Sequence, residues 1–134
     1  MKDLKDRTVI IVDDNQVDRE ILKSCCMNLG LKILAIEDSA NAALSRLDNF
    51  AKQNIVPELM LLDILMMEMD GFTLAEEIRS DTRFNHSKLI AITSDETAVK
   101  VIENIKTGFN AVLAKPISSI TLQNIIQKVL KENP

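Results

Sequence analysis

Residues 59–62 are all apolar and run directly into a carboxylate at Asp63, and this stretch limits the fold more than any other. A strand that is apolar at every position suits a sheet buried on both faces, which is typical of parallel sheets covered by helices. In open sheets of this kind, ligand sites form beyond the carboxyl ends of the strands. The stretch therefore predicts an α/β fold and marks Asp63 as a candidate chemical residue.

Strand-like and helix-like segments alternate along the rest of the chain. Four more segments are rich in β-branched or other apolar residues and are predicted strands: residues 8–12, 31–36, 88–93 and 111–114. Apolar residues recur at helical spacing between them, over residues 17–29, 40–51, 71–78, 96–105 and 119–129. This alternation predicts a parallel sheet with helices on both faces and right-handed crossovers. We expect one domain over residues 1–134, with a structured core over about residues 7–131.

Several residues at the ends of these segments indicate where elements start and stop. Pro57 is expected to open the central strand, and Ser39 to cap the second helix. Gly30 and Gly108 are expected to end the first and fourth helices. Residues 80–87 are predicted to be a polar connection.

The composition is that of an acidic globular chain. Its length of 134 residues fits one domain, and 46% of the residues are hydrophobic. No apolar run is long enough to span a membrane, and the charged N-terminal residues lack the apolar core of a signal peptide. The net charge of −4 argues against nucleic-acid binding by this domain. Adjacent Cys25 and Cys26 suit neither a disulfide nor a metal site, so we expect reduced thiols in a cytoplasmic protein.

Polar residues end or follow all five predicted strands. Those of the second strand, Glu37 and Asp38, are expected to lie farther out because that strand is at the edge of the sheet. The others are Asp13 and Asp14 after the first strand, Asp63 at the end of the third, Thr93 at the end of the fourth and Lys115 after the fifth. Because parallel strands end at a common edge, we expect these side chains to meet there. The acids and Thr93 are also of residue types that cap helices, so a purely structural reading stays open at this point.

Three carboxylates in one cleft repel each other unless a cation lies between them. Mg²⁺ prefers oxygen ligands and is usually held by one or two carboxylates together with a phosphoryl oxygen. A carboxylate in such a site can attack phosphorus and form an aspartyl phosphate. Lys115 and the Thr93 hydroxyl can then contact other oxygens of the phosphoryl group. The predicted edge therefore indicates Mg²⁺-dependent phosphoryl chemistry at Asp63.

The chain resembles a response-regulator receiver domain of two-component signalling over essentially its whole length. Residues 11–15 resemble the first strand and acidic pair of that family, and residues 63–71 resemble its phosphorylation loop. Residues 92–94 and 113–117 are similar to the ends of its fourth and fifth strands. The resemblance implies a flavodoxin-like, doubly wound sheet of five parallel strands in the order 2-1-3-4-5, with five helices.

The resemblance also implies a role for each residue at the edge. Asp63 would be the phosphoacceptor, and Thr93 and Lys115 would contact the phosphoryl group. Mg²⁺ would be bound directly by Asp14, by Asp63 and by the backbone carbonyl of Leu65. Asp13 would bind the ion through water, and the Lys115-Pro116 peptide would be cis.

The partners implied are a histidine kinase or phosphotransfer protein as donor and a downstream protein or an appended output domain as target. The chain would be a phosphoaccepting signalling domain and no enzyme, apart from its own phosphorylation and dephosphorylation. Neither nucleic acid nor a membrane is an expected partner.

Three places in the chain depart from the family pattern. Met67 replaces a frequent proline in the loop after Asp63, and Val112 replaces an aromatic residue that usually moves together with the Thr93 position. Asn110 and Ala111 stand where one branch of the family carries acids used in a dimer contact, which argues against that dimer and against a DNA-binding output of that type. The missing aromatic residue at Val112 motivates an alternative, a pseudo-receiver that binds its partner without phosphorylation. A third reading, a phosphohydrolase, normally needs an acid two residues after the nucleophile, where this chain has Leu65.

Overall fold

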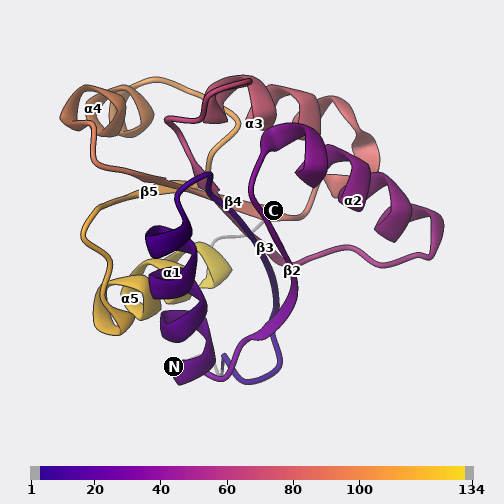
Figure 1. The fold of residues 1–134 in the computed structure, drawn as a ribbon, viewed down its shortest axis with the longest axis horizontal. Helices are drawn as coiled ribbons and strands as arrows, with labels where there is room; N and C mark the ends of the chain where they lie inside the picture. The colour runs from indigo at the N-terminus through magenta and orange to yellow at the C-terminus, as the bar shows by residue number, and fades with distance from the viewer. Residues whose placement is uncertain (1–3, 132–134) are drawn as a thin grey trace.

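The computed structural model describes residues 4–131 and contains one five-stranded parallel sheet (Figure 1). The strands are β1 (Thr8–Val12), β2 (Lys32–Glu37), β3 (Leu59–Asp63), β4 (Lys88–Thr93) and β5 (Ala111–Ala114). Their order is β2-β1-β3-β4-β5, and every neighbouring pair is parallel. The predicted flavodoxin-like fold is thus confirmed. The predicted domain bounds at residues 1 and 134 lie outside the described residues.

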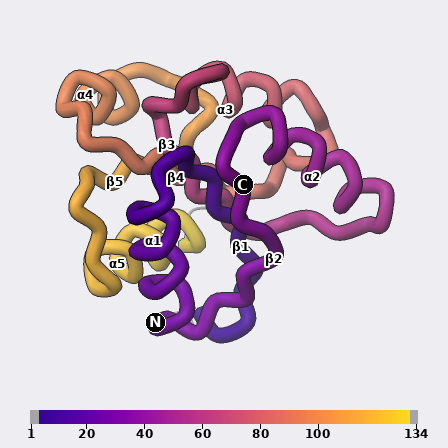
Figure 2. The backbone as a smooth tube through the Cα atoms, in the orientation of Figure 1, coloured from indigo at the N-terminus to yellow at the C-terminus, as the bar shows by residue number. Residues whose placement is uncertain are grey.

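Five helices cover the two faces of the sheet. They are α1 (Gln16–Asn28), α2 (Ala40–Lys52), α3 (Gly71–Ser80), α4 (Glu96–Asn104) and α5 (Ser119–Lys131). Helices α1 and α5 lie together on one face, and α2, α3 and α4 lie on the other (Figures 1 and 2). Between residues 4 and 131, no helix is long and apolar enough to cross a lipid bilayer.

Every residue of β3 is buried, which explains its unbroken apolar sequence. Leu59 and Leu61 pack in the core beneath α1 and α5, whereas Met60 and Leu62 pack in the core beneath α2 and α3. Alternate residues of a strand point to opposite faces of the sheet. A strand that lies between two layers of helices therefore needs apolar residues on both faces. This double burial holds Asp63 in a fixed place at the edge of the sheet.

Capping residues determine where helices α2 and α1 begin and end. The Ser39 hydroxyl accepts a hydrogen bond from the Ala42 N–H at the start of α2, as predicted. Gly30, with φ at +77°, follows the end of α1, where a left-handed residue ends the helix at low cost.

Cys25 and Cys26 are free and buried in the core, and burial raises the pKa of Cys26 to about 12.

Three sequence predictions were wrong in detail. The central strand begins at Leu59 and not at Pro57. The connection after α3 contains a short 3-10 helix, η1 (Thr82–Phe84), whose Phe84 side chain is buried beneath α3. Helix α4 ends at Asn104, so Gly108 is not the residue that ends it. The Gly108 carbonyl instead accepts a hydrogen bond from the Arg79 side chain.

The loop from Asp63 to α3 leaves no room for a side chain at Gly71. The Gly71 N–H donates to the Ile64 carbonyl at 2.8 Å, and an added Cβ would lie 2.5 Å from the Asp63 carbonyl oxygen. Both Asp63 and Ile64 would have to shift their backbone, because the second close atom is the Ile64 Cα at 2.8 Å. The glycine therefore fixes the loop that carries Asp63.

We expect Gly71→Ala to lower the free energy of unfolding by about 2–3 kcal/mol, the range for overpacking a close contact. Urea unfolding monitored by circular dichroism measures this loss. Gly108→Ala is the comparison variant, because its added Cβ would lie 3.1 Å from the Arg79 Cγ and 3.3 Å from the Ala75 carbonyl oxygen, which are looser contacts than those at Gly71 and predict a smaller loss. Equal losses in the two variants would contradict the assignment of a tight backbone contact at Gly71.

Candidate functional site

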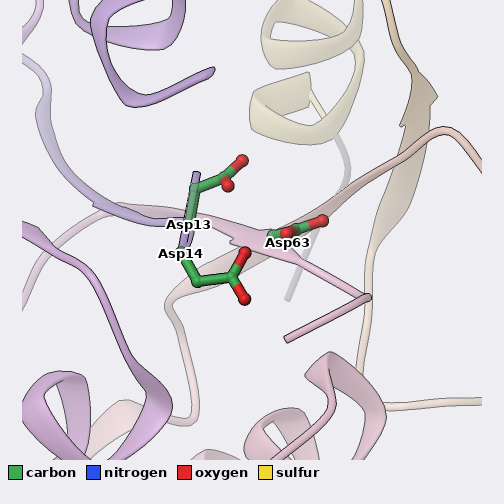
Figure 3. Close-up of side chains that lie close together, drawn as sticks. All are labelled: Asp13, Asp14 and Asp63. Carbon is green, nitrogen blue, oxygen red and sulfur yellow. The ribbon is translucent and has the colours of Figure 1, made fainter. Parts of the chain in front are cut away.

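Three carboxylates meet where β1 and β3 end. Asp13 and Asp14 directly follow β1, and Asp63 is the last residue of β3. The two strands are neighbours, with Val12 paired to Leu62, so the residues that follow reach the same edge. One carboxylate oxygen from each acid lies within 4.8 Å of the other two (Figure 3). The Asp13 and Asp63 side chains are buried, while Asp14 is exposed and opens the group to solvent.

The Asp63 carboxyl is hard to ionise in this setting. Burial, followed by repulsion from Asp13 and more weakly from Asp14, raises the pKa of Asp63 to about 6. Two neighbours act in the opposite direction and stabilise the anion, namely the Lys115 ammonium and the backbone N–H of Leu65. Asp63 is therefore poised between its protonated and ionised forms near neutral pH.

Lys115, which follows β5, supplies the positive charge opposite the acids. Its Nζ lies 3.6 Å from Asp63 Oδ1 and 3.2 Å from Asp13 Oδ2, and 2.7 Å from Asp18 Oδ2 in the first turn of α1. Burial lowers the pKa of Lys115, but the hydrogen bond to Asp18 and the charges of the other two acids outweigh it, so the pKa is raised. The lysine stays charged at neutral pH. The peptide bond from Lys115 to Pro116 is cis, as the resemblance implies.

Thr93 ends the neighbouring strand, β4, and is fully buried. Its hydroxyl oxygen accepts a hydrogen bond from the Asp95 N–H at 3.0 Å, just before α4 begins. That bond uses an oxygen lone pair and leaves the hydroxyl hydrogen available for a second partner. The Asp95 carboxylate in turn caps α4 by accepting from the Thr97 N–H. Thr93 thus has a local structural role at the same edge where its phosphoryl contact is predicted.

The structure brings Asp13, Asp14, Asp63 and Lys115 together, as the sequence predicts. Leu65 contributes its N–H to the Asp63 carboxylate, while its side chain is 55% exposed; the role of its carbonyl as a ligand stays a prediction.

Sequence reasoning missed Asp18, which makes the shortest contact to Lys115. A signal was present, since Asn15 is a capping residue and an acid three positions later lies in the first turn beside the strand ends.

The donor set suits a hard divalent cation. Three carboxylates offer only oxygen ligands, and the positive charge of an ion would relieve the repulsion that raises the pKa of Asp63. A hollow of about 340 Å³ opens beside Asp14, with Glu68 and Met66 also on its wall. Solvent and a small ligand can therefore reach Asp14 from this side.

The fold is a doubly wound parallel sheet, and at its edge three acids that could hold a cation lie opposite a lysine. The sequence matches the family described as "Response regulator receiver domain" over residues 9–127. The chain belongs to that family, which is a family of signalling domains.

Two curated relatives come from Helicobacter pylori. The chain is 30% identical to chemotaxis protein CheY1 over 125 residues, which cover 93% of this chain and 98% of CheY1. It is 31% identical to the sensor histidine kinase CheAY over 126 residues, which cover 94% of this chain but only 15% of the kinase.

A solved structure of a related protein, the CheX-CheY-BeF3-Mg complex from Borrelia burgdorferi, matches with a TM-score of 0.72. The identity is 25%, with 93% of this chain and 90% of the other chain covered.

Proposed function

We propose that this chain is a phosphoacceptor switch of two-component signalling, in which Asp63 takes a phosphoryl group from a phosphohistidine of a histidine kinase or a phosphotransfer protein. The observation that carries this proposal is the grouping of Asp13, Asp14 and Asp63 with Lys115 at one sheet edge. Each of these residues occupies the position that the family pattern gives it.

The transfer itself needs an ionised Asp63. One of its oxygens attacks the phosphorus and a P–O bond forms, while the P–N bond of the donor breaks. The bonding electron pair returns to the imidazole nitrogen, and the histidine leaves as a neutral ring because its other ring nitrogen carries a proton in the phosphorylated donor. Lys115 and the Thr93 hydroxyl bind the phosphoryl oxygens and spread their charge during the transfer.

We infer that Mg²⁺ is the cofactor, held directly by Asp14, by Asp63 and by the Leu65 carbonyl, and through water by Asp13. When bound, the ion offsets the negative charge of the acids and of the incoming phosphoryl group. The all-oxygen donor set and the exposure of Asp14 support this assignment. The Borrelia complex, which contains both Mg²⁺ and a beryllium fluoride, supports it for a relative.

The output surface in this proposal is the face formed by α4, β5 and α5. Val112 lies in β5, half-buried in a small core with Ala98 of α4 and with Phe109. We infer that phosphorylation shifts an existing two-state equilibrium and changes this face, which a protein partner or an appended output domain reads. We place the chain in the cytoplasm, where its phosphodonors act, and treat it as a single receiver domain. The phosphorylation-independent alternative has no support from the comparisons.

A direct test is incubation of the folded protein with Mg²⁺ and a small acyl phosphate, followed by intact mass measurement. We expect a gain of one phosphoryl group, and no gain when Mg²⁺ is chelated before the acyl phosphate is added. Amide NMR is the parallel readout, because the chain has no Trp or Tyr. A folded sample that shows neither a mass change nor a spectral change would refute the proposal. Partner binding that survives Asp63→Ala unchanged would then favour the pseudo-receiver.

A further inference from the structure

Asp18 is the nearest partner of the lysine that is expected to bind the phosphoryl group. It lies in the first turn of α1 and is outside the group of three acids that could hold a metal ion. Its Oδ2 is 2.7 Å from Lys115 Nζ, whereas the Lys115 contact to Asp63 is 3.6 Å long. In the unphosphorylated chain the ammonium is therefore held more closely by α1 than by the phosphoacceptor.

The position of Asp18 is fixed by its own backbone. Its N–H donates to the Asn15 side chain at 2.9 Å, which caps α1 and orients the first turn toward the strand ends. The side chain is 30% exposed and that of Lys115 17%, so this ion pair is partly shielded from water. Lys115 is flanked by a hollow of about 310 Å³, which Asp18 and Ile21 also line. The ion pair thus borders open space on this side and is not enclosed by packed side chains there.

We propose that Asp18 is a positioning residue that holds the Lys115 ammonium back from Asp63 and so sets how strongly the site binds a phosphoryl group. Nζ has three N–H donors and uses two of them on Asp18 and Asp13, so a phosphoryl oxygen on Asp63 can take the third, and the pull toward it stretches the 2.7 Å contact to Asp18. The phosphoryl group and Asp18 compete for one cation, and the weakening of the Asp18 contact subtracts from binding. This inference rests on the proposed function.

The test compares Asp18→Asn with wild type in the binding of beryllium fluoride at saturating Mg²⁺, measured by amide NMR titration. Because partly exposed ion pairs contribute modestly, we expect Asp18→Asn to bind about twofold to fivefold more tightly. Glu20→Gln is the matched control. It removes the same charge from the same helix, but Glu20 is exposed and the structure shows no ion pair from it to Lys115, so its charge is largely screened.

A second readout needs no metal. In metal-free protein labelled at lysine, the Lys115 ammonium signal is expected to shift in Asp18→Asn and to stay unchanged in Glu20→Gln. A merely structural contact between α1 and the loop after β5 would lower the unfolding temperature of Asp18→Asn but leave the affinity for beryllium fluoride as it is. That result would overturn the inference.

A double-mutant cycle separates competition for Lys115 from direct repulsion of the anion by Asp18. In a Lys115→Met background, Asp18→Asn is expected to have no effect on beryllium fluoride affinity. An equal gain in both backgrounds would assign the effect to direct repulsion and overturn the positioning role. If wild type binds no beryllium fluoride, the proposed function itself fails. If wild type binds it and Asp18→Asn binds equally or more weakly, only this inference fails.

Discussion

Asp63→Asn is expected to make the protein more stable at neutral pH while abolishing its phosphorylation. The folded structure raises the pKa of Asp63 from 3.8 to about 6, chiefly through burial and the nearby Asp13. Between these two pH values the unfolded chain has released the Asp63 proton and the folded chain still holds it, so stability falls as pH rises. A gap of about two pH units corresponds to a loss of about 3 kcal/mol above pH 6. Asparagine keeps the shape and cannot ionise.

Urea unfolding in the presence of a chelator measures this effect at two pH values. At pH 8 we expect Asp63→Asn to be about 2–3 kcal/mol more stable than wild type, and at about pH 3.5 the two should agree closely. Glu76→Gln is the control, since Glu76 is an exposed acid of α3 and should show no pH-dependent difference. If the asparagine variant is less stable than wild type at pH 8, the pKa of Asp63 is not raised by its surroundings.

The same urea unfolding experiment with added Mg²⁺ compares how much stability wild type and Asp63→Asn gain from the ion. Any ligand that binds the folded state alone stabilises it, by an amount that rises with the logarithm of its affinity when the ligand is in excess. Wild type is expected to gain stability from Mg²⁺ at pH 8, and to gain less at pH 5, where Asp63 holds its proton. Asp63→Asn offers one charged ligand fewer and is expected to gain less than wild type at pH 8. Intact mass should show no phosphoryl adduct on this variant.

Most of the fold could be predicted because local sequence and tertiary burial agree. The apolar residues of β3 need two covering layers, and the alternating strand and helix patterns supply them. The errors fall where distant contacts decide the structure. Phe84 forms part of a buried core in a segment that reads as polar, and Gly108 is held by Arg79 from a different helix rather than by the end of α4.

The site could be predicted as far as strand topology determines it. Asp13, Asp14, Asp63 and Lys115 all follow strands of one parallel sheet, so their meeting needs only the strand order. Asp18 comes from a helix, and whether it reaches the edge depends on how α1 is rotated about its axis. The raised pKa of Asp63 depends on burial and interatomic distances, which no pattern of residues specifies.

Lys115→Met is expected to weaken phosphorylation and strengthen Mg²⁺ binding, two effects of opposite sign. The ammonium is 3.6 Å from Asp63 and 3.2 Å from Asp13, so it neutralises part of the charge that would otherwise attract a metal ion. Without the ammonium, only Mg²⁺ can neutralise the charge of Asp13 and Asp63. The phosphoryl group in turn loses a charged hydrogen-bond donor during transfer, which is expected to slow phosphorylation by about 10- to 100-fold. Methionine keeps most of the apolar stem.

The free energy of unfolding of Lys115→Met is expected to depend on pH, because the lost ammonium lies beside Asp63. Lys115 lowers the pKa of Asp63, so its removal raises that pKa further and lowers the free energy of unfolding at pH 8 by about 2–4 kcal/mol. At pH 3.5 Asp63 holds its proton, so the loss is expected to be smaller. Mg²⁺ should restore more stability to Lys115→Met than it adds to wild type, because it replaces the missing cation.

Lys128→Met, which removes an exposed lysine of α5, is the control for Lys115→Met and should change neither metal affinity nor the phosphorylation rate. Isothermal titration with Mg²⁺ and the time course of phosphorylation by a small acyl phosphate separate the two effects. A lysine that only braces the loop after β5 would weaken both functions together when it is lost. Tighter Mg²⁺ binding combined with slower phosphorylation requires that Lys115 faces the same acids as the metal and the phosphoryl group.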